Sequence, residues 1–218
     1  MTYIIAMVSQ KGGSGKSSLA RMIAREFTVG GLKTKIADLD TQQQTCTHWA
    51  GRRAENGITP EIQVQSFASV KTALEDAPRF DALILDGKPN ASEQTHEIAM
   101  VADLIVIPTG QTLDDLHPGV LLAHALRKKH IPIAKIAFAL FKTTGSAREI
   151  LAAQEYLTLA GYTVLDGEVA VSTAYGVASD VGKTITETPY RSLNTKSFRL
   201  AQSIIDRVAE LSQEHVAQ

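Results

Sequence analysis

A glycine-rich segment directly after an apolar run constrains the fold of this chain more than any other feature. Residues 10–18 read Gln-Lys-Gly-Gly-Ser-Gly-Lys-Ser-Ser and follow the apolar residues 3–8. In such a strand–loop–helix unit the glycines let successive backbone N–H groups face one point, and the helix N-terminus adds partial positive charge. The segment therefore predicts a phosphate-binding loop, with a helix beginning near Lys16, in an α/β protein.

The residue types in this loop predict its contacts with a nucleoside triphosphate. Lys16 is expected to reach the β- and γ-phosphates, and the Ser17 hydroxyl is expected to coordinate Mg²⁺. The loop departs from the standard pattern, because Gln10 stands where the first glycine is usual and a second lysine follows it. The residues expected to bind the nucleotide are Lys11, Gly12, Gly13, Ser14, Gly15, Lys16, Ser17 and Ser18.

The bulk composition is typical of a globular protein with one domain. The chain has 218 residues, 44% hydrophobic and 21% charged, with no break in composition, so we predict a single domain over 1–218. The formal net charge of -1 provides no general attraction to nucleic acid or to an anionic membrane. Any binding to DNA must therefore use a local basic patch.

Two absences in the sequence narrow the class of protein. Cys46 is the single cysteine, which excludes an intrachain disulfide and a multi-cysteine metal site within the chain. The N-terminal apolar run is brief and leads into the glycine loop, unlike a signal peptide, and no apolar stretch approaches the roughly 20 residues that span a bilayer. We therefore expect a cytoplasmic protein.

Apolar runs alternate with amphipathic stretches along the whole chain. This alternation predicts an α/β fold, with a doubly wound, mostly parallel sheet flanked by helices. Strands are expected at 3–9, 34–38, 61–66, 82–86, 104–108, 134–140 and 162–165. Helices are expected at 15–28, 43–56, 69–76, 92–101, 114–128, 147–160 and 193–211. The stretch 166–192 is the least regular and reads as a loop with short turns or as a rim facing a nucleotide.

Three aspartates follow predicted strands on the side of the sheet where the glycine loop begins. Asp86 ends the apolar run 82–85 and is a candidate partner of Mg²⁺, directly or through water, although it could instead cap the next helix. Asp38 and Asp40 end the strand after the first predicted helix. A carboxylate there can hold or deprotonate a water in line with the leaving phosphate, and a solvated turn is the alternative.

The loop pattern Lys-Gly-Gly-x-Gly-Lys-Ser and the box Asp-Leu-Asp-Thr-Gln at 38–42 resemble the ParA/MinD superfamily of deviant Walker A ATPases. The length is most similar to the short ParF-like partition proteins, and Thr41 replaces the family's proline. The resemblance implies ATP and Mg²⁺ as cofactors, Asp40 as the hydrolysis residue and Asp38 as a helper near the metal. It also implies that Lys11 reaches across an ATP-dependent homodimer to the partner's phosphates, whereas a solvent-facing lysine is the alternative.

Two further segments support the resemblance more weakly. Pro108 and Asp114, after the predicted strand 104–108, correspond to a family turn that lines the nucleotide and the dimer interface, although an ordinary capped turn also explains them. The segment that begins Thr-Ala-Tyr at 173–175 is similar to a family segment with a short helix near the adenine. The family's preceding arginine is replaced here by Val171, Ser172 or Thr173.

The cargo of such an ATPase decides its biological role. Basic residues near the C-terminus are candidates for nonspecific, salt-sensitive binding to DNA, and a solvated helical face is the alternative: Lys183, Arg191, Lys196, Arg199 and Arg207. The polar and acidic end 210–218 argues against a membrane anchor. The resemblance implies a nucleoid-associated plasmid-partition ATPase with a centromere-binding ParB-type partner. A MinD-like ATPase for another cargo, a dethiobiotin-synthetase-like enzyme and an inactive interaction protein are the alternatives.

Overall fold

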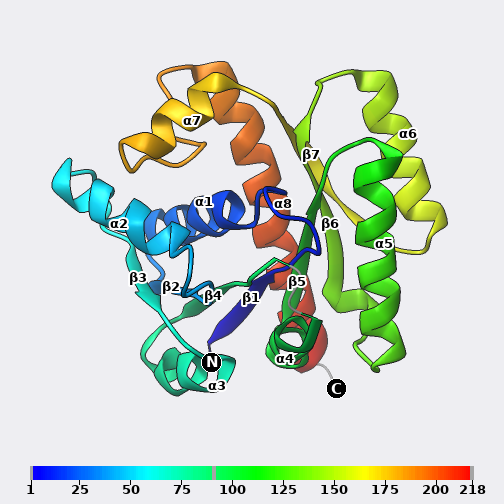
Figure 1. Cartoon of the computed structure of the whole chain (residues 1–218), viewed down its shortest axis with the longest axis horizontal. Helices are drawn as coiled ribbons and strands as arrows, with labels where there is room; N and C mark the ends of the chain where they lie inside the picture. The colour runs from blue at the N-terminus through cyan, green and yellow to red at the C-terminus, as the bar shows by residue number, and fades with distance from the viewer. Residues whose placement is uncertain (1, 90–91, 217–218) are drawn as a thin grey trace.

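A seven-stranded parallel sheet in the order β3-β2-β4-β1-β5-β6-β7 organises the residues that the structure describes, which are 2–89 and 92–216 (Figure 1). The computed structural model confirms the predicted doubly wound α/β fold, since every strand pair is parallel and helices cover both faces. The strands are β1 (Tyr3–Met7), β2 (Thr34–Asp38), β3 (Gln63–Ser66), β4 (Ala82–Asp86), β5 (Leu104–Thr109), β6 (Ile136–Thr143) and β7 (Thr163–Ala170).

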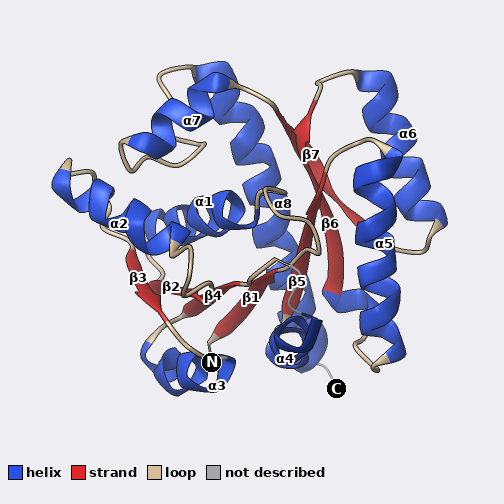
Figure 2. Ribbon diagram, viewed as in Figure 1, coloured by secondary structure: helices blue, strands red, loops and turns tan. Residues whose placement is uncertain are grey.

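Two helical layers enclose the sheet (Figure 2). The first core joins the sheet to α1, α2 and α8, and the second joins it to α3, α4, α5 and α6. The helices are α1 (Lys16–Val29), α2 (Thr45–Glu55), α3 (Val70–Asp76), α4 (Ser92–Val101), α5 (Leu113–Lys128), α6 (Ala147–Leu159), α7 (Thr173–Asp180) and α8 (Arg191–Val216), with short 3₁₀ turns at Ala77–Arg79 and Ile133–Lys135. None of the described helices combines the length and apolar character needed to cross a membrane.

The central strands are apolar on consecutive positions because both faces of the sheet are covered. Every residue of β2, β4 and β5 is buried. The parallel register places Met7 beside Asp86 and Asp38 beside Asp86, so the ends of β1, β4 and β2 lie at one edge of the sheet. Ligands of doubly wound folds bind at this carboxyl edge, where the strand order reverses.

The structure differs from the sequence prediction most in the stretch 166–192. Strand β7 continues to Ala170 instead of ending at 165, and α7 occupies Thr173–Asp180, so the prediction of mainly loop and turns was wrong for half of the stretch. The outer half of β7 was missed because β7 is an edge strand with polar residues on its open face. The sequence predicts no membrane anchor at 210–218, and residues 217 and 218 of this segment lie outside the described residues.

Candidate active site

The glycine loop connects β1 to α1 and has the strand–loop–helix form predicted for it. Gly15 precedes the first residue of α1 with a φ of 110°, and a Cβ there would lie 2.2 Å from the Phe141 ring, so both backbone and space require glycine. The Ser9 hydroxyl lies 2.7 Å from both the Lys11 carbonyl and the Ser14 hydroxyl. The loop is therefore held by its own polar groups around the start of α1.

Lys16 is a buried cation at the base of this loop. The residue is 7% exposed, and its Nζ donates to the Ser9 Oγ at 3.5 Å. Burial lowers the pKa of Lys16, while the charges of Asp86 and Asp40 act in the opposite direction. Lys16 forms no ion pair with any carboxylate of the described residues, so its ammonium can bind an anion at the loop without breaking one.

Asp86 lies at the end of β4 beside Ser17 and Cys46. Its residue is 3% exposed, Oδ2 accepts a hydrogen bond from the Cys46 thiol at 3.2 Å, and Oδ1 is buried without a hydrogen-bond partner. Burial raises the pKa of Asp86 to about 6, against the lowering effect of its neighbours Ser17 and Cys46. An unpartnered carboxylate oxygen beside a serine hydroxyl is a donor set that fits a hydrated Mg²⁺.

Asp38 is buried at the end of β2 and caps α2. One oxygen accepts hydrogen bonds from the Cys46 and Thr47 N–H groups at 3.0 Å each and from the Thr47 hydroxyl at 3.1 Å. The other oxygen accepts from the Asp40 N–H at 3.2 Å. Both oxygens of Asp38 therefore accept hydrogen bonds from the protein itself. We expect Asp38 to act on the metal region indirectly, by fixing the segment that carries Asp40.

Asp40 lies in the turn between β2 and α2. It is half-buried, and its Oδ1 accepts hydrogen bonds from the Gln42 and Gln43 N–H groups at 3.2 and 3.1 Å. Its charge also acts on Lys16. The turn thus holds this carboxylate within electrostatic reach of Lys16, the lysine expected to contact the phosphates.

The second lysine of the loop contacts α5. Lys11 Nζ forms a 2.6 Å ion pair with Asp115, whose other oxygen accepts from the Thr112 hydroxyl at 2.8 Å. A cavity of about 260 Å³ between the loop and the start of α5 is lined by Pro108 and by Asp115. Asp114 is exposed and does not line this cavity, and its charge acts on Lys11, so its predicted place at a dimer interface stays a prediction.

A second cavity, of about 400 Å³, lies beside the first turn of α1, and we expect it to take the nucleoside half of a nucleotide; we call it the nucleoside cavity. Two basic residues missed by the sequence prediction line it. Arg21 joins α1 to the neighbouring segments by donating to the Thr45 carbonyl at 2.6 Å and to the Ser179 hydroxyl at 3.0 Å. Lys142 has a φ of 61° and donates to the Gly13 carbonyl at 2.7 Å. The residues that line the cavity include Ser18, Arg21, Phe141, Lys142, Tyr175, Ser179, Lys183, Thr184 and Ile185.

The five predicted DNA-binding residues do not form one free basic patch. Lys183 is exposed and lines the nucleoside cavity, apart from the four predicted residues on α8. Arg199 pairs with Asp166 through hydrogen bonds of 2.7 and 2.9 Å. Arg207 pairs with Glu210 at 3.0 Å and donates to a backbone carbonyl. Arg191 and Lys196, both exposed on α8, keep the predicted character.

The sheet, the glycine loop and the buried lysine and aspartate at the strand ends define a P-loop nucleotide-binding protein. Residues 3–112, just over half of the chain, match the family model described as ATPase MipZ. The chain belongs to this family of ATPases, within the ParA/MinD superfamily.

Individual relatives agree with this assignment. Protein ParA of Rhizobium radiobacter is 26% identical over 208 residues, which are 92% of this chain and 90% of the relative. The chromosome-partitioning ATPase Soj of Thermus thermophilus is 29% identical over 133 residues, which are 48% of this chain and 53% of Soj. The septum site-determining protein MinD of Pyrococcus horikoshii, solved with Mg-ADP, has a similar fold, with a TM-score of 0.75 and 14% identity over 94% of this chain and 96% of MinD.

Replacing Asp86 with asparagine is expected to stabilise the nucleotide-free protein above pH 6. Because the folded-state pKa of about 6 lies above the ordinary 3.8, this group favours folding below pH 4 and loses that contribution as pH rises through 6. A shift of this size corresponds to about 2–3 kcal/mol. Urea unfolding of both proteins from pH 4 to 8 should show a stability difference that grows with pH, and a difference independent of pH would contradict the burial argument.

Proposed function

We propose that this chain is a DNA-partition ATPase that binds Mg·ATP, dimerises around it and hydrolyses it slowly. The observation that carries the proposal is the pair of lysines on one loop, with Lys16 buried at its base and Lys11 exposed at its mouth. One lysine suffices to bind the nucleotide of its own subunit. The exposure of Lys11 supports a role in which it acts on a nucleotide held by a second copy.

The chain's own residues account for binding and for the chemical step. Ser17 and Asp86 would hold Mg²⁺, which supplies charge neutralisation at the phosphates when bound. Lys16 stabilises negative charge on the β- and γ-phosphates from a site shielded from water. Asp40 accepts a hydrogen bond, and then a proton, from the water that attacks the γ-phosphorus, and Asp38 keeps Asp40 in place through the turn.

Dimerisation requires Lys11 to leave Asp115. The lysine side chain is 56% exposed, and exposed ion pairs contribute about 0–1 kcal/mol, so a phosphate of the facing subunit can replace this carboxylate at little cost. Once there, the ammonium adds positive charge where the transition state gathers negative charge. Hydrolysis and dimer formation would in this way depend on the same residue.

The partition role is supported by the Soj relative, whose name states chromosome partitioning, and by the exposed basic residues of α8. We infer that Arg191 and Lys196 of both subunits contact DNA phosphates in the dimer, and that a ParB-type partner stimulates hydrolysis and resets it. A plasmid is the cargo that we propose. A MinD-like role with another cargo is the second candidate, because MinD of Pyrococcus horikoshii shares the fold over 94% of this chain.

Fluorescence anisotropy of a random-sequence DNA duplex tests this function. We expect binding with ATP, little with ADP or without nucleotide, and an affinity that falls steeply from low to physiological salt. The double variant Arg191→Ala/Lys196→Ala should weaken binding and flatten the salt dependence. The matched control Arg79→Ala removes an exposed arginine from the opposite helical layer. Absence of binding with every nucleotide would favour another cargo or a small-molecule substrate.

Replacing Lys11 with alanine is expected to leave a monomer that still binds ADP. The variant loses the exposed ion pair with Asp115 and the cross-subunit contact, whereas Lys16 and the loop N–H groups still hold the phosphates of a bound ADP. Analytical ultracentrifugation with ATP measures the result. In the matched variant Asp115→Ala the lysine is released from its pair, so dimerisation should equal or exceed that of the wild type. A Lys11→Ala protein that dimerises normally would refute the cross-subunit role.

A further inference from the structure

The segment from Ser179 to Glu187 links the nucleoside cavity to α2. Its residues Ser179, Lys183, Thr184 and Ile185 form one wall of the cavity. The same segment lies against α2, which begins at the Asp38 cap and ends at Glu55. A nucleotide that fills the cavity must therefore fit against a wall whose position depends on its packing against α2.

The backbone of this segment approaches α2 more closely than any side chain would permit. Gly182 has a φ of 82°, and a Cβ on it would lie 2.3 Å from the Arg53 nitrogen and 2.4 Å from the Arg53 Cα. The indole N–H of Trp49, also on α2, donates to the Lys183 carbonyl at 3.1 Å. These contacts bring the cavity wall and the helix together as one packed unit.

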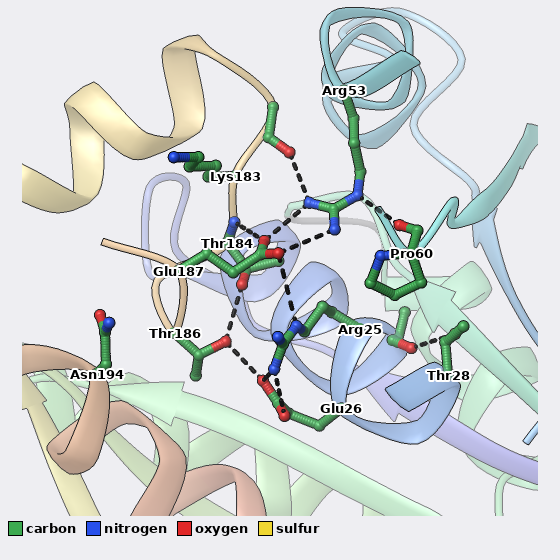
Figure 3. A network of polar contacts seen from close by, with 12 residues as sticks. Arg25, Glu26, Thr28, Arg53, Pro60, Lys183, Thr184, Thr186, Glu187 and Asn194 are labelled. Atoms are coloured by element: carbon green, nitrogen blue, oxygen red, sulfur yellow. Dashed lines mark hydrogen bonds and ion pairs between the residues drawn. The ribbon is translucent and has the colours of Figure 1, made fainter. Parts of the chain in front are cut away.

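Arg53 is the centre of the polar contacts that fix this unit (Figure 3). Its side chain is 2% exposed, and it donates to the Gly182 carbonyl at 2.9 Å and to the Pro60 carbonyl at 2.9 Å. Two further hydrogen bonds, of 2.8 and 3.0 Å, reach the two carboxylate oxygens of Glu187. Such a bidentate pair fixes orientation as well as distance.

Glu187 connects Arg53 to the cavity wall through hydrogen bonds to both. Its Oε2 also accepts a hydrogen bond from the Thr184 N–H at 2.8 Å, and Arg25 of α1 lies 3.6 Å away. Burial alone would raise the pKa of Glu187, but the bonds from Arg53 and Thr184 and the charges of Arg53 and Arg25 hold it below its usual value. The carboxylate is thus ionised and engaged on three sides at neutral pH.

We propose that the buried Arg53–Glu187 pair positions the wall of the nucleoside cavity and so sets the affinity for the nucleoside half of the nucleotide. Neither side chain lines the cavity, so both act through the backbone of residues 182–184. Burying two charges costs free energy that an apolar pair of the same size would not, and stability alone therefore does not explain the pair. The proposal rests on the proposed nucleotide site but not on DNA as cargo.

The test compares ATP with inorganic triphosphate, which reaches the glycine loop but has no nucleoside. In Glu187→Gln, which keeps the size of the side chain and removes its charge, we expect ATP affinity to fall about tenfold and triphosphate affinity to stay within about twofold. Calorimetric titration with Mg²⁺ present measures both. In this variant the Thr184 N–H should also exchange its hydrogen faster, because in the wild type this N–H donates a hydrogen bond to Glu187.

Two further variants keep the test decisive. Trp49→Phe keeps an aromatic side chain on α2 but replaces the indole with a smaller ring and removes its hydrogen bond to the Lys183 carbonyl, so it should show a smaller loss, about threefold, again for ATP only. Asp76→Asn removes the charge that pairs with Lys35 in a partly buried ion pair on the far side of the sheet, and it should change neither affinity. Parallel losses of ATP and triphosphate in Glu187→Gln, or unchanged ATP affinity, would overturn the proposal. If the ATP and triphosphate affinities change as expected but the protein does not bind DNA, the partition function is refuted and this proposal is retained.

Discussion

Replacing Lys16 with methionine is expected to lower the affinity for ATP at least about a hundredfold, because two charge-assisted hydrogen bonds of about 1.5 kcal/mol or more each are lost. The wild-type ammonium is already buried and unpaired with any described carboxylate, so it contributes its full charge to the phosphates. Methionine keeps the apolar stem and its packing. Calorimetric titration with Mg·ATP measures the loss, and the variant should remain folded at the same temperature as the wild type or above it.

The matched variant for this prediction is Lys142→Met. Lys142 also contacts the glycine loop, through the Gly13 carbonyl, but its side chain is exposed and water competes for its charge. Replacement of Lys142 should therefore weaken ATP binding only several-fold, much less than replacement of Lys16. Tight ATP binding by Lys16→Met, or an equal loss in both variants, would refute the assignment of Lys16 to the phosphates.

Local sequence patterns predicted the parts of the fold that depend on local chemistry. The apolar runs of the central strands, the glycines of the loop and the aspartates at strand ends each carry their information in a few neighbouring residues. The edge strand β7 was predicted too short because one of its faces is open, so its outer half lacks a continuous apolar run. In an α/β protein, a strand forms a continuous apolar run in the sequence only where both of its faces are buried.

The remaining site residues depend on tertiary contacts that no local pattern contains. Asp114 and Asp115 are equally good candidates in the sequence, and only the rotation of α5 decides that Asp115 meets Lys11. Lys142 reaches the loop across 129 positions, and Arg53 reaches Glu187 across 134. Only the tertiary fold brings these residues together.

The distinction between Asp38 and Asp40 also needed the structure. The family resemblance assigns hydrolysis to Asp40 and a helper role near the metal to Asp38, and the structure adds that Asp38 is fully buried and uses its oxygens for the turn and for α2. Asp40 uses one oxygen for the turn. Substitutions of the two should therefore differ in kind, with Asp38→Asn lowering thermal stability through lost capping bonds and Asp40 variants acting on turnover.

Replacing Asp40 with alanine is expected to leave ATP affinity within about threefold of the wild type and to lower turnover about a hundredfold or more, the usual effect of removing a general base. The complication is that Asp40 also builds a turn, through bonds from Gln42 and Gln43 to its Oδ1. Asp40→Asn separates the two roles, because its amide oxygen can accept the same two bonds but cannot take a proton from water. We expect Asp40→Asn to be as slow as Asp40→Ala in single-turnover hydrolysis. Recovery of wild-type turnover by the asparagine variant would assign Asp40 to the turn alone and leave the attacking water without its base.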